Sequence, residues 1–278
     1  MQAQTVKMQG PTVKTSVKAL VVFTYVAMIA VNVLANALPI NGRTTGAISD
    51  AYQNLFAPAG LTFAIWGVIY LLLGAHVLYQ LGLFHSPDDK GGAGDSRRVA
   101  LLERVGVLFS LSSLANVAWI LSWHFDLILL STLLLTTMLV LLVLITRTIL
   151  AADLSPRDRA LVRLPFSVYF GWLTVATIAN ITVWLVSIGW DGFGIPESIW
   201  AVAIIGTAVI VRDFDIAYGL VLVWAYLGIW IKHTSATGFN GAYPAVIATA
   251  LVGIAALLVA GVVTILRRRN HLRAKLVA

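Results

Sequence analysis

The chain has 278 residues, of which 59% are hydrophobic and 11% charged, and its mean hydropathy is +0.90. This composition excludes the water-soluble classes of protein. The net charge of +7 does not require a nucleic-acid partner, because the basic residues follow a membrane-orientation pattern described below. The chain contains no cysteine, which excludes disulfides and thiolate metal sites.

Apolar segments along the chain predict an all-α polytopic membrane helix bundle of about eight transmembrane helices. A helix needs roughly 20 residues to cross ~30 Å of hydrocarbon at about 1.5 Å per residue. The sixth segment is shorter than this and contains Gly206. The predicted spans are Lys18–Leu38, Gly60–Phe84, Leu101–Leu121, Leu127–Leu150, Val162–Ser187, Glu197–Val211, Phe214–Ile231 and Pro244–Leu266.

The distribution of basic residues predicts the orientation of the bundle. Of the 19 Lys and Arg residues, 17 flank the spans on one side, and only Arg43 and Lys232 fall on the other. Positive charge is retained on the cytoplasmic side. We therefore expect a cytoplasmic (inner) membrane protein with both termini in the cytoplasm, which requires an even number of spans. The basic tail, 267–275, is expected to attract anionic membrane lipid.

The first span has an alternative interpretation. Lys18, the apolar run after it and the small residues Ala35-Asn36-Ala37 imitate a cleavable signal peptide. Cleavage would leave an odd number of spans and would conflict with the charge pattern. We favour a true span.

The nine tryptophans are distributed unevenly across the predicted membrane. Trp172 and Trp224 lie near the middle, and the other seven fall toward the non-cytoplasmic face. Aromatic anchors normally occupy both interfaces, so this bias predicts an aromatic-lined pocket in that leaflet, while some of the rings are expected to be plain anchors. The first loop, residues 39–58, is long and rich in small polar residues. Loops of this kind are usually functional, and we expect this one to cover the pocket.

Four asparagines lie at similar predicted depth, about 21–27 Å from the cytoplasmic end of their helices. They are Asn32, Asn36, Asn116 and Asn180. Trp66 is expected at the same level. Two interpretations stay open: the amides join helix to helix, or they line a shared cavity with the tryptophans.

The sequence contains no HExxH, CxxC, Walker or nucleophile-elbow motif. We therefore predict no catalytic residue and no metal ligand, and an intramembrane enzyme is disfavoured. His76 lies well inside a span. It either relays a proton or forms a hydrogen bond to a neighbouring helix, and we favour the second interpretation.

Three segments then resemble the TspO/MBR, or tryptophan-rich sensory protein, family. They are YQNLFAPAGLTFAIWGVIYLLLGA (Tyr52–Ala75), LANVAWILSW and YFGWLTVATIANITVW, and they occur in the family's order on the expected helices. Two prolines of the family pattern are absent. The family has a proline directly before Tyr169, and it has two prolines ahead of the second helix where this chain has only Pro58. The resemblance covers the first five spans.

This resemblance implies that 1–187 form a five-helix bundle whose hydrophobic cavity is closed by the first loop. It implies binding of a planar hydrophobic ligand such as a tetrapyrrole (porphyrin), with no resident cofactor. The ligand-binding residues it carries over are Trp66, Tyr70, Asn116, Trp119, Tyr169, Trp172 and Asn180.

Residues 188–278 are expected to form three additional transmembrane helices and the basic cytoplasmic tail. The alternative function is a secondary transporter or exporter of another small solute. The oligomeric state stays open, a homodimer included.

Overall fold

The computed structural model describes residues 12–38, 40–84, 93–207 and 215–277, and every regular element in them is helical. The predicted all-α membrane bundle is confirmed. Its helices are α1 (Thr15–Ala37), α2 (Thr45–Ala51), α3 (Ile65–Leu81), α4 (Ala93–His124), α5 (Ile128–Leu150), α6 (Pro156–Asp158), α7 (Leu164–Ser187), α8 (Glu197–Thr207), α9 (Ile216–Thr234) and α10 (Pro244–Val277).

Seven helices of the described residues are long and apolar enough to cross a membrane. The sixth predicted span differs. The described part of helix α8 has 11 residues, which corresponds to about 16 Å of helix and is shorter than the hydrocarbon thickness. The rest of that predicted span, from 208 onward, lies outside the described residues. Helix α8 packs against α10.

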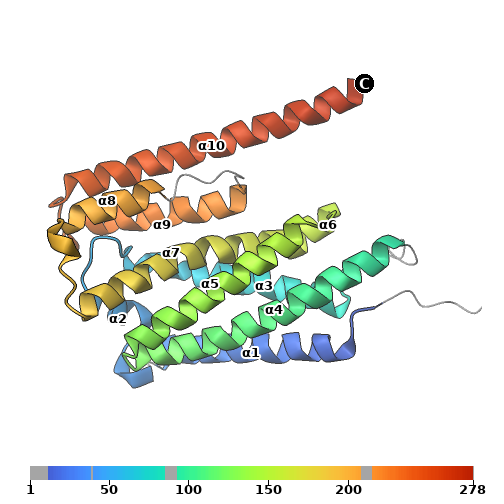
Figure 1. Cartoon of the computed structure of the whole chain (residues 1–278), viewed down its shortest axis with the longest axis horizontal. Coiled ribbons are helices and arrows are strands. Elements are labelled where there is room, and N and C mark those ends of the chain that lie inside the picture. The colour runs from blue at the N-terminus through green and yellow to red at the C-terminus, as the bar shows by residue number, and fades with distance from the viewer. Residues whose placement is uncertain (1–11, 39, 85–92, 208–214, 278) are drawn as a thin grey trace, which may run out of the picture.

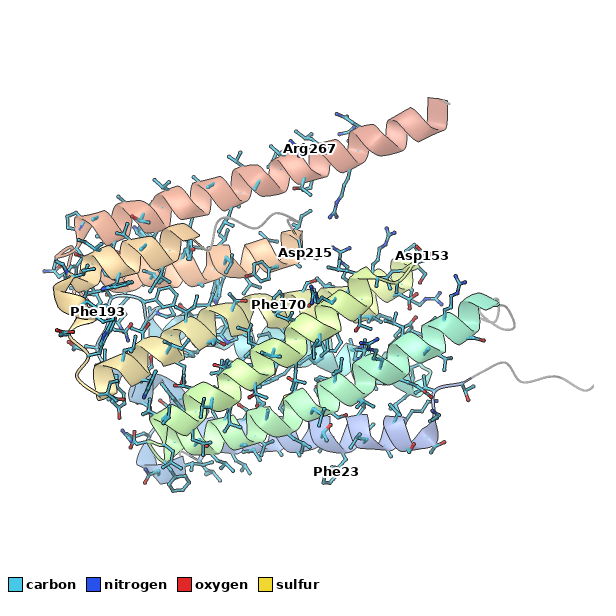
Figure 2. All side chains as sticks on the ribbon, in the orientation of Figure 1. Phe23, Asp153, Phe170, Phe193, Asp215 and Arg267 are labelled. Atoms are coloured by element: carbon cyan, nitrogen blue, oxygen red, sulfur yellow. The ribbon has the colours of Figure 1, made fainter. Side chains whose placement is uncertain are left out.

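The long helices lie side by side, with α1 at one edge of the molecule and α10 at the other (Figure 1). Between them, contacts run from α1 to α4, α5, α7, α9 and α10 in turn, while α3 packs on α1 and α7. The apolar stretch of α4 is 56% buried, against 22% for α1 and for α10. Helix α4 therefore has the most buried apolar stretch of the long helices, and the edge helices present apolar side chains outward, as Phe23 does in Figure 2.

The two ends of the bundle differ in character. One end, here called the loop end, carries the first loop and the connections 188–196 and 235–243. The opposite end, here called the basic end, carries α6 and the last turns of α10. Figure 2 shows Phe193 at the loop end and Asp153 at the basic end.

A buried carboxylate ties the basic end together. Asp158 Oδ1 accepts a hydrogen bond from the Tyr79 hydroxyl at 2.6 Å and lies 3.4 Å from Arg98 Nε. Its Oδ2 accepts from the hydroxyl of Ser155, which caps α6 in return. Because Asp158 is only 5% exposed, these partners replace the water that its charge would otherwise need. Helices α3, α4 and α6 thus meet at one side chain.

Replacing Asp158 by Ala should lower the free energy of unfolding by about 3 kcal/mol, because it removes the carboxylate that the Tyr79 hydroxyl and the Arg98 guanidinium share. Denaturation in mild detergent measures this. The matched control is Asp153→Ala, since Asp153 is exposed on the same connection and its loss should change stability little. Equal stability of the two variants would contradict the role assigned to Asp158.

Candidate functional site

An aromatic cluster forms around Trp66, near the start of α3. The Trp66 ring stacks on Tyr70 and on Trp119, with centroids 5.5 and 5.8 Å apart. Its edge contacts are with Tyr169 at 6.1 Å and Trp172 at 6.3 Å. Five of the seven predicted site residues, from α3, α4 and α7, therefore share one cluster. Their role in binding stays a prediction.

Helical spacing explains why these rings meet. Trp66 and Tyr70 are four residues apart on α3, and Tyr169 and Trp172 are three apart on α7, so each pair shares one helix face. Trp119, Tyr169 and Trp172 are buried, whereas Trp66 and Tyr70 are partly buried. Offset and edge-to-face contacts are the favoured geometries of such rings.

The first of the two predicted amides, Asn116, joins helices. Its Oδ1 accepts a hydrogen bond of 2.6 Å from Asn32 Nδ2, and Asn32 also donates to the Met28 carbonyl. Helix α1 is thereby fixed to α4. Asn116 is absent from the lining of the cavity described below. Its hydrogen bond to Asn32 joins two helices, which is one of the two interpretations that the sequence analysis left open.

The second predicted amide, Asn180, lies in the cavity wall, and both its oxygen and its nitrogen form hydrogen bonds, whereas Asn116 Nδ2 has no partner within the described residues. Asn180 Oδ1 accepts from the Thr132 hydroxyl at 2.6 Å, and its Nδ2 donates to the Ser131 hydroxyl at 3.0 Å. Asn180 therefore joins α7 to α5. Asn36 differs again, because its Oδ1 accepts from the backbone of Thr45 in the first loop. The four asparagines do not surround one hollow.

The cavity beside the aromatic cluster is small. Its volume is about 30 Å³, which is room for one water molecule. Trp66, Trp119 and Trp172 form its wall, and Thr45 and Pro58 of the first loop cover it. In this structure the cavity has no room for a ligand larger than water, and the first loop lies over it in the position expected of a lid.

One half of the first loop is bonded to the end of α4. The indole Nε1 of Trp123 donates to the Thr45 carbonyl at 3.1 Å, and the Thr45 hydroxyl lies 3.2 Å from His124 Nε2. Arg43 forms an ion pair with Asp126 just beyond α4. These contacts hold α2 above the aromatic cluster.

The other half of the loop is bonded to α9. His233 Nε2 donates to the Leu55 carbonyl at 2.9 Å, and Lys232 Nζ forms an ion pair with Asp50 at 3.0 Å. The backbone N–H of Ala59 donates to the Gly228 carbonyl at 3.0 Å. The sequence analysis found no motif in α9. The one available signal was Lys232, one of only two basic residues assigned to that side.

Two buried polar groups in the cluster have no hydrogen-bond partner within the described residues. The Nε1 atoms of Trp119 and Trp172 are buried and donate no hydrogen bond within the described residues. A buried donor without an acceptor costs roughly 1–3 kcal/mol. Both rings line the small cavity, so an acceptor that enters there would recover this energy.

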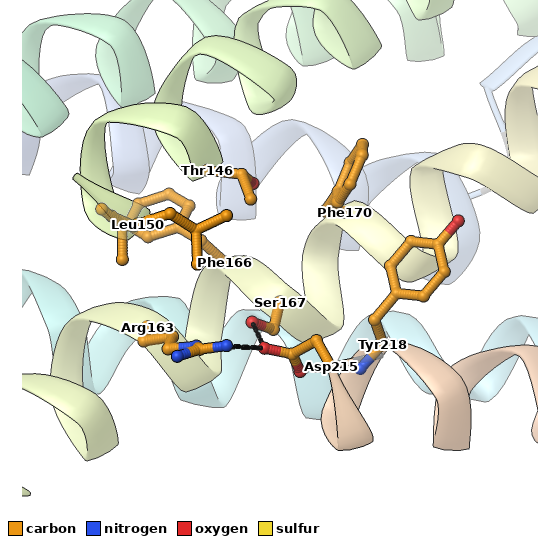
Figure 3. Close-up of a pocket in the computed structure, with 9 residues that line it drawn as sticks. Thr146, Leu150, Arg163, Phe166, Ser167, Phe170, Asp215 and Tyr218 are labelled. Carbon is orange, nitrogen blue, oxygen red and sulfur yellow. Dashed lines mark hydrogen bonds and ion pairs between the residues drawn. The ribbon is translucent and has the colours of Figure 1, made fainter. Parts of the chain in front are cut away.

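A second cavity of about 280 Å³ lies toward the basic end between α5, α7 and α9 (Figure 3). Arg163 Nη2 and Asp215 Oδ2 are 3.0 Å apart there, and the Ser167 hydroxyl donates to the same oxygen. Asp215 also caps α9. The charged groups are satisfied by one another, and the remaining wall is largely apolar.

No group of three His, Asp or Glu side chains gathers as a set of metal ligands in the part of the chain that the structure describes. The polar groups at the aromatic cluster are indoles, amides and hydroxyls, which offer hydrogen bonds and contain no evident nucleophile with an adjacent base. The site can therefore bind and orient a molecule.

The model of the family described as TSPO-like protein matches residues 18–263. The chain belongs to the TSPO-like protein family. The resemblance found in the sequence is thereby confirmed, and the match continues through α8, α9 and most of α10. No curated protein and no solved structure matches the chain. The division of the chain at residue 187 stays a prediction.

The contact between α9 and the first loop can be tested by adding a single methyl group at Gly228. A Cβ on Gly228 would lie 2.9 Å from the Cβ atoms of Pro58 and Thr62. Gly228→Ala should therefore destabilise the protein by about 2 kcal/mol through overpacking and should make the first loop more sensitive to protease. Gly67→Ala is the control, because a Cβ there meets nothing within 4 Å. If both variants behave like the parent protein, α9 does not hold the loop.

Proposed function

We propose that this protein binds a planar hydrophobic ligand of the tetrapyrrole class at the aromatic cluster once the first loop moves aside. The observation that carries the proposal is the position of Trp66. Its ring contacts four other aromatic rings from three helices, directly beneath a loop that closes the cavity.

The chemistry of the cluster suits such a ligand. Indole and phenol rings offer flat apolar surfaces for stacking. The two unpartnered indole N–H groups of Trp119 and Trp172 offer donors to an oxygen acceptor, such as a carboxylate or carbonyl on the ligand. Buried polar groups that converge on an apolar site give a ligand its orientation.

The closed cavity sets a condition on binding. A volume of about 30 Å³ excludes any ligand larger than water, so the ligand would bind a state in which the loop is displaced. Binding then draws the population toward the open state, and the apparent affinity is reduced by the fraction of closed protein.

The same proposal places the basic end in the cytoplasm and the first loop on the opposite side of a cytoplasmic membrane, since basic residues favour the cytoplasmic side. Anionic lipid would contact Arg267, Arg268 and Arg269 at the end of α10.

The transporter alternative gains no specific support. His76, its expected proton carrier, donates to the Leu161 carbonyl at 2.9 Å and is packed against the rings of Phe109 and Phe166. This contact is a hydrogen bond to a neighbouring helix, the kind of contact that the sequence analysis favoured.

Trp66→Leu and Trp172→Leu should each weaken binding of a porphyrin by about ten-fold, because each removes a stacking surface. Titration of the purified protein in lipid nanodiscs, followed by the Soret absorbance, measures the affinity. Trp66→Phe keeps a ring and should lose less.

The control for this titration is Trp230→Leu. Trp230 lies on α9 and is absent from the cavity lining, so the affinity should stay at the parent value. Unchanged affinity in folded Trp66 and Trp172 variants would overturn the proposal.

A further inference from the structure

A larger cavity opens at the loop end, away from the aromatic cluster. It has a volume of about 360 Å³ and is lined by the first loop, the end of α7, the connection 188–196 and α8. None of its lining residues belongs to the lining of the small cavity. It is therefore a separate site, built largely from the part of the chain that follows α7.

Two tryptophans form an aromatic wall of this cavity. The rings of Trp190 and Trp200 are 5.5 Å apart and inclined by 51°. Trp200 is fixed by a hydrogen bond of 3.1 Å from its Nε1 to the Gly192 carbonyl. Gly192 has φ +65°, and a Cβ there would lie 3.2 Å from Trp200 Nε1, so a glycine suits both the turn and the ring. Both indoles are partly buried and keep some accessible surface.

The cavity also carries two carboxylates, Asp191 and Glu197. One oxygen of Asp191 accepts from the Phe193 backbone, whereas no hydrogen bond or ion pair involving the Glu197 carboxylate is found among the described residues. The basic residues predicted for this end do not neutralise them: Arg43 is paired with Asp126, and Lys232 with Asp50. Within the described residues the cavity therefore has negative charge without a cation.

The remaining wall is apolar, with Phe56, Leu185 and Ile204 among its residues. Aromatic faces attract cations through the ring quadrupole, and carboxylates add a full opposite charge. Asp191 and Glu197 are both exposed, so water solvates them when no ligand is bound. An anion would be repelled at the same place, whereas a neutral apolar molecule would gain no attraction from these charges.

We propose that this cavity binds an organic cation with an apolar body, such as an alkylammonium compound. Trp190 and Trp200 face the cationic group, Glu197 and Asp191 balance its charge, and the apolar wall holds the body of the molecule. This site is independent of the tetrapyrrole proposal and does not require the first loop to move.

The test is a calorimetric titration of the full chain in nanodiscs of neutral lipid with benzyltrimethylammonium. Benzenesulfonate, of similar size and opposite charge, is the matched probe. The parent protein should bind the cation saturably and benzenesulfonate not at all. Glu197→Gln should raise the Kd about five-fold by loss of one charge, and Trp190→Leu by about ten-fold through loss of the cation–π contact.

Two control variants accompany the titration. Trp230→Leu and Asp153→Asn change the same residue types at positions absent from the cavity lining, and both should keep the parent Kd. Circular dichroism confirms that each variant is folded. Saturable binding of both probes alike, no binding of the cation, or an unchanged Kd in the folded Glu197 and Trp190 variants would each overturn the proposal.

Discussion

The pairing of polar side chains in surroundings without water is the constraint on which this structure depends. Unpaired polar groups are costly in hydrocarbon, so helices that carry them are held where the partners meet. Asn116 meets Asn32 between α4 and α1, and Asn180 meets Ser131 and Thr132 between α7 and α5. These bonds fix the helices whose aromatic faces form the cluster.

The first loop obeys the same constraint at the loop end. It is bonded to α4 through Thr45 and to α9 through Leu55 and Asp50. Each contact is a hydrogen bond or an ion pair near the end of a helix. The Lys232–Asp50 ion pair is exposed and weak, and water can replace the buried hydrogen bonds once the loop is displaced. The loop is thus attached at two sides by bonds that can be broken, above a cluster of rings that are themselves firmly packed.

The two indole N–H groups of Trp119 and Trp172 depart from this pattern. Native proteins leave few buried donors unpaired, and each such group needs an explanation. The cavity beside them has room for one water molecule, and a water molecule there would be the simplest acceptor in the closed state. A ligand acceptor would replace that partner in the open state, which connects the packing defect to the proposed function.

Much of the fold could be predicted from the sequence, because apolar length and helical spacing are local properties. Seven long helices follow from hydropathy, and the shared face of Trp66 and Tyr70 follows from their four-residue spacing. The described part of α8 ends at Thr207, so the predicted end of that span at Val211 lies outside the described residues. The start of α4 at Ala93 was missed, since the Gly- and Asp-containing residues before the span are polar.

The candidate site was less accessible to sequence reasoning. The rings that meet could be named from their helical positions, whereas the volume between them depends on packing across helices. The contribution of α9 was missed for a related reason. Its bonds to the loop use the carbonyls of Leu55 and Gly228. Every residue has a backbone carbonyl, so the sequence does not indicate which carbonyls will be used. The depth of Asn32, Asn116 and Asn180 could be counted, but their partners could not.

The most direct test of the account asks whether the first loop must leave before a ligand can enter. The chain has no cysteine, so an Asp50→Cys, Lys232→Cys protein carries only the two thiols that replace an ion pair between the loop and α9. A reducible bifunctional thiol reagent would join them, and porphyrin binding would be measured before and after reduction. The account predicts that binding is lost while the loop is cross-linked and returns on reduction. A cross-linked protein that binds with unchanged affinity would contradict it.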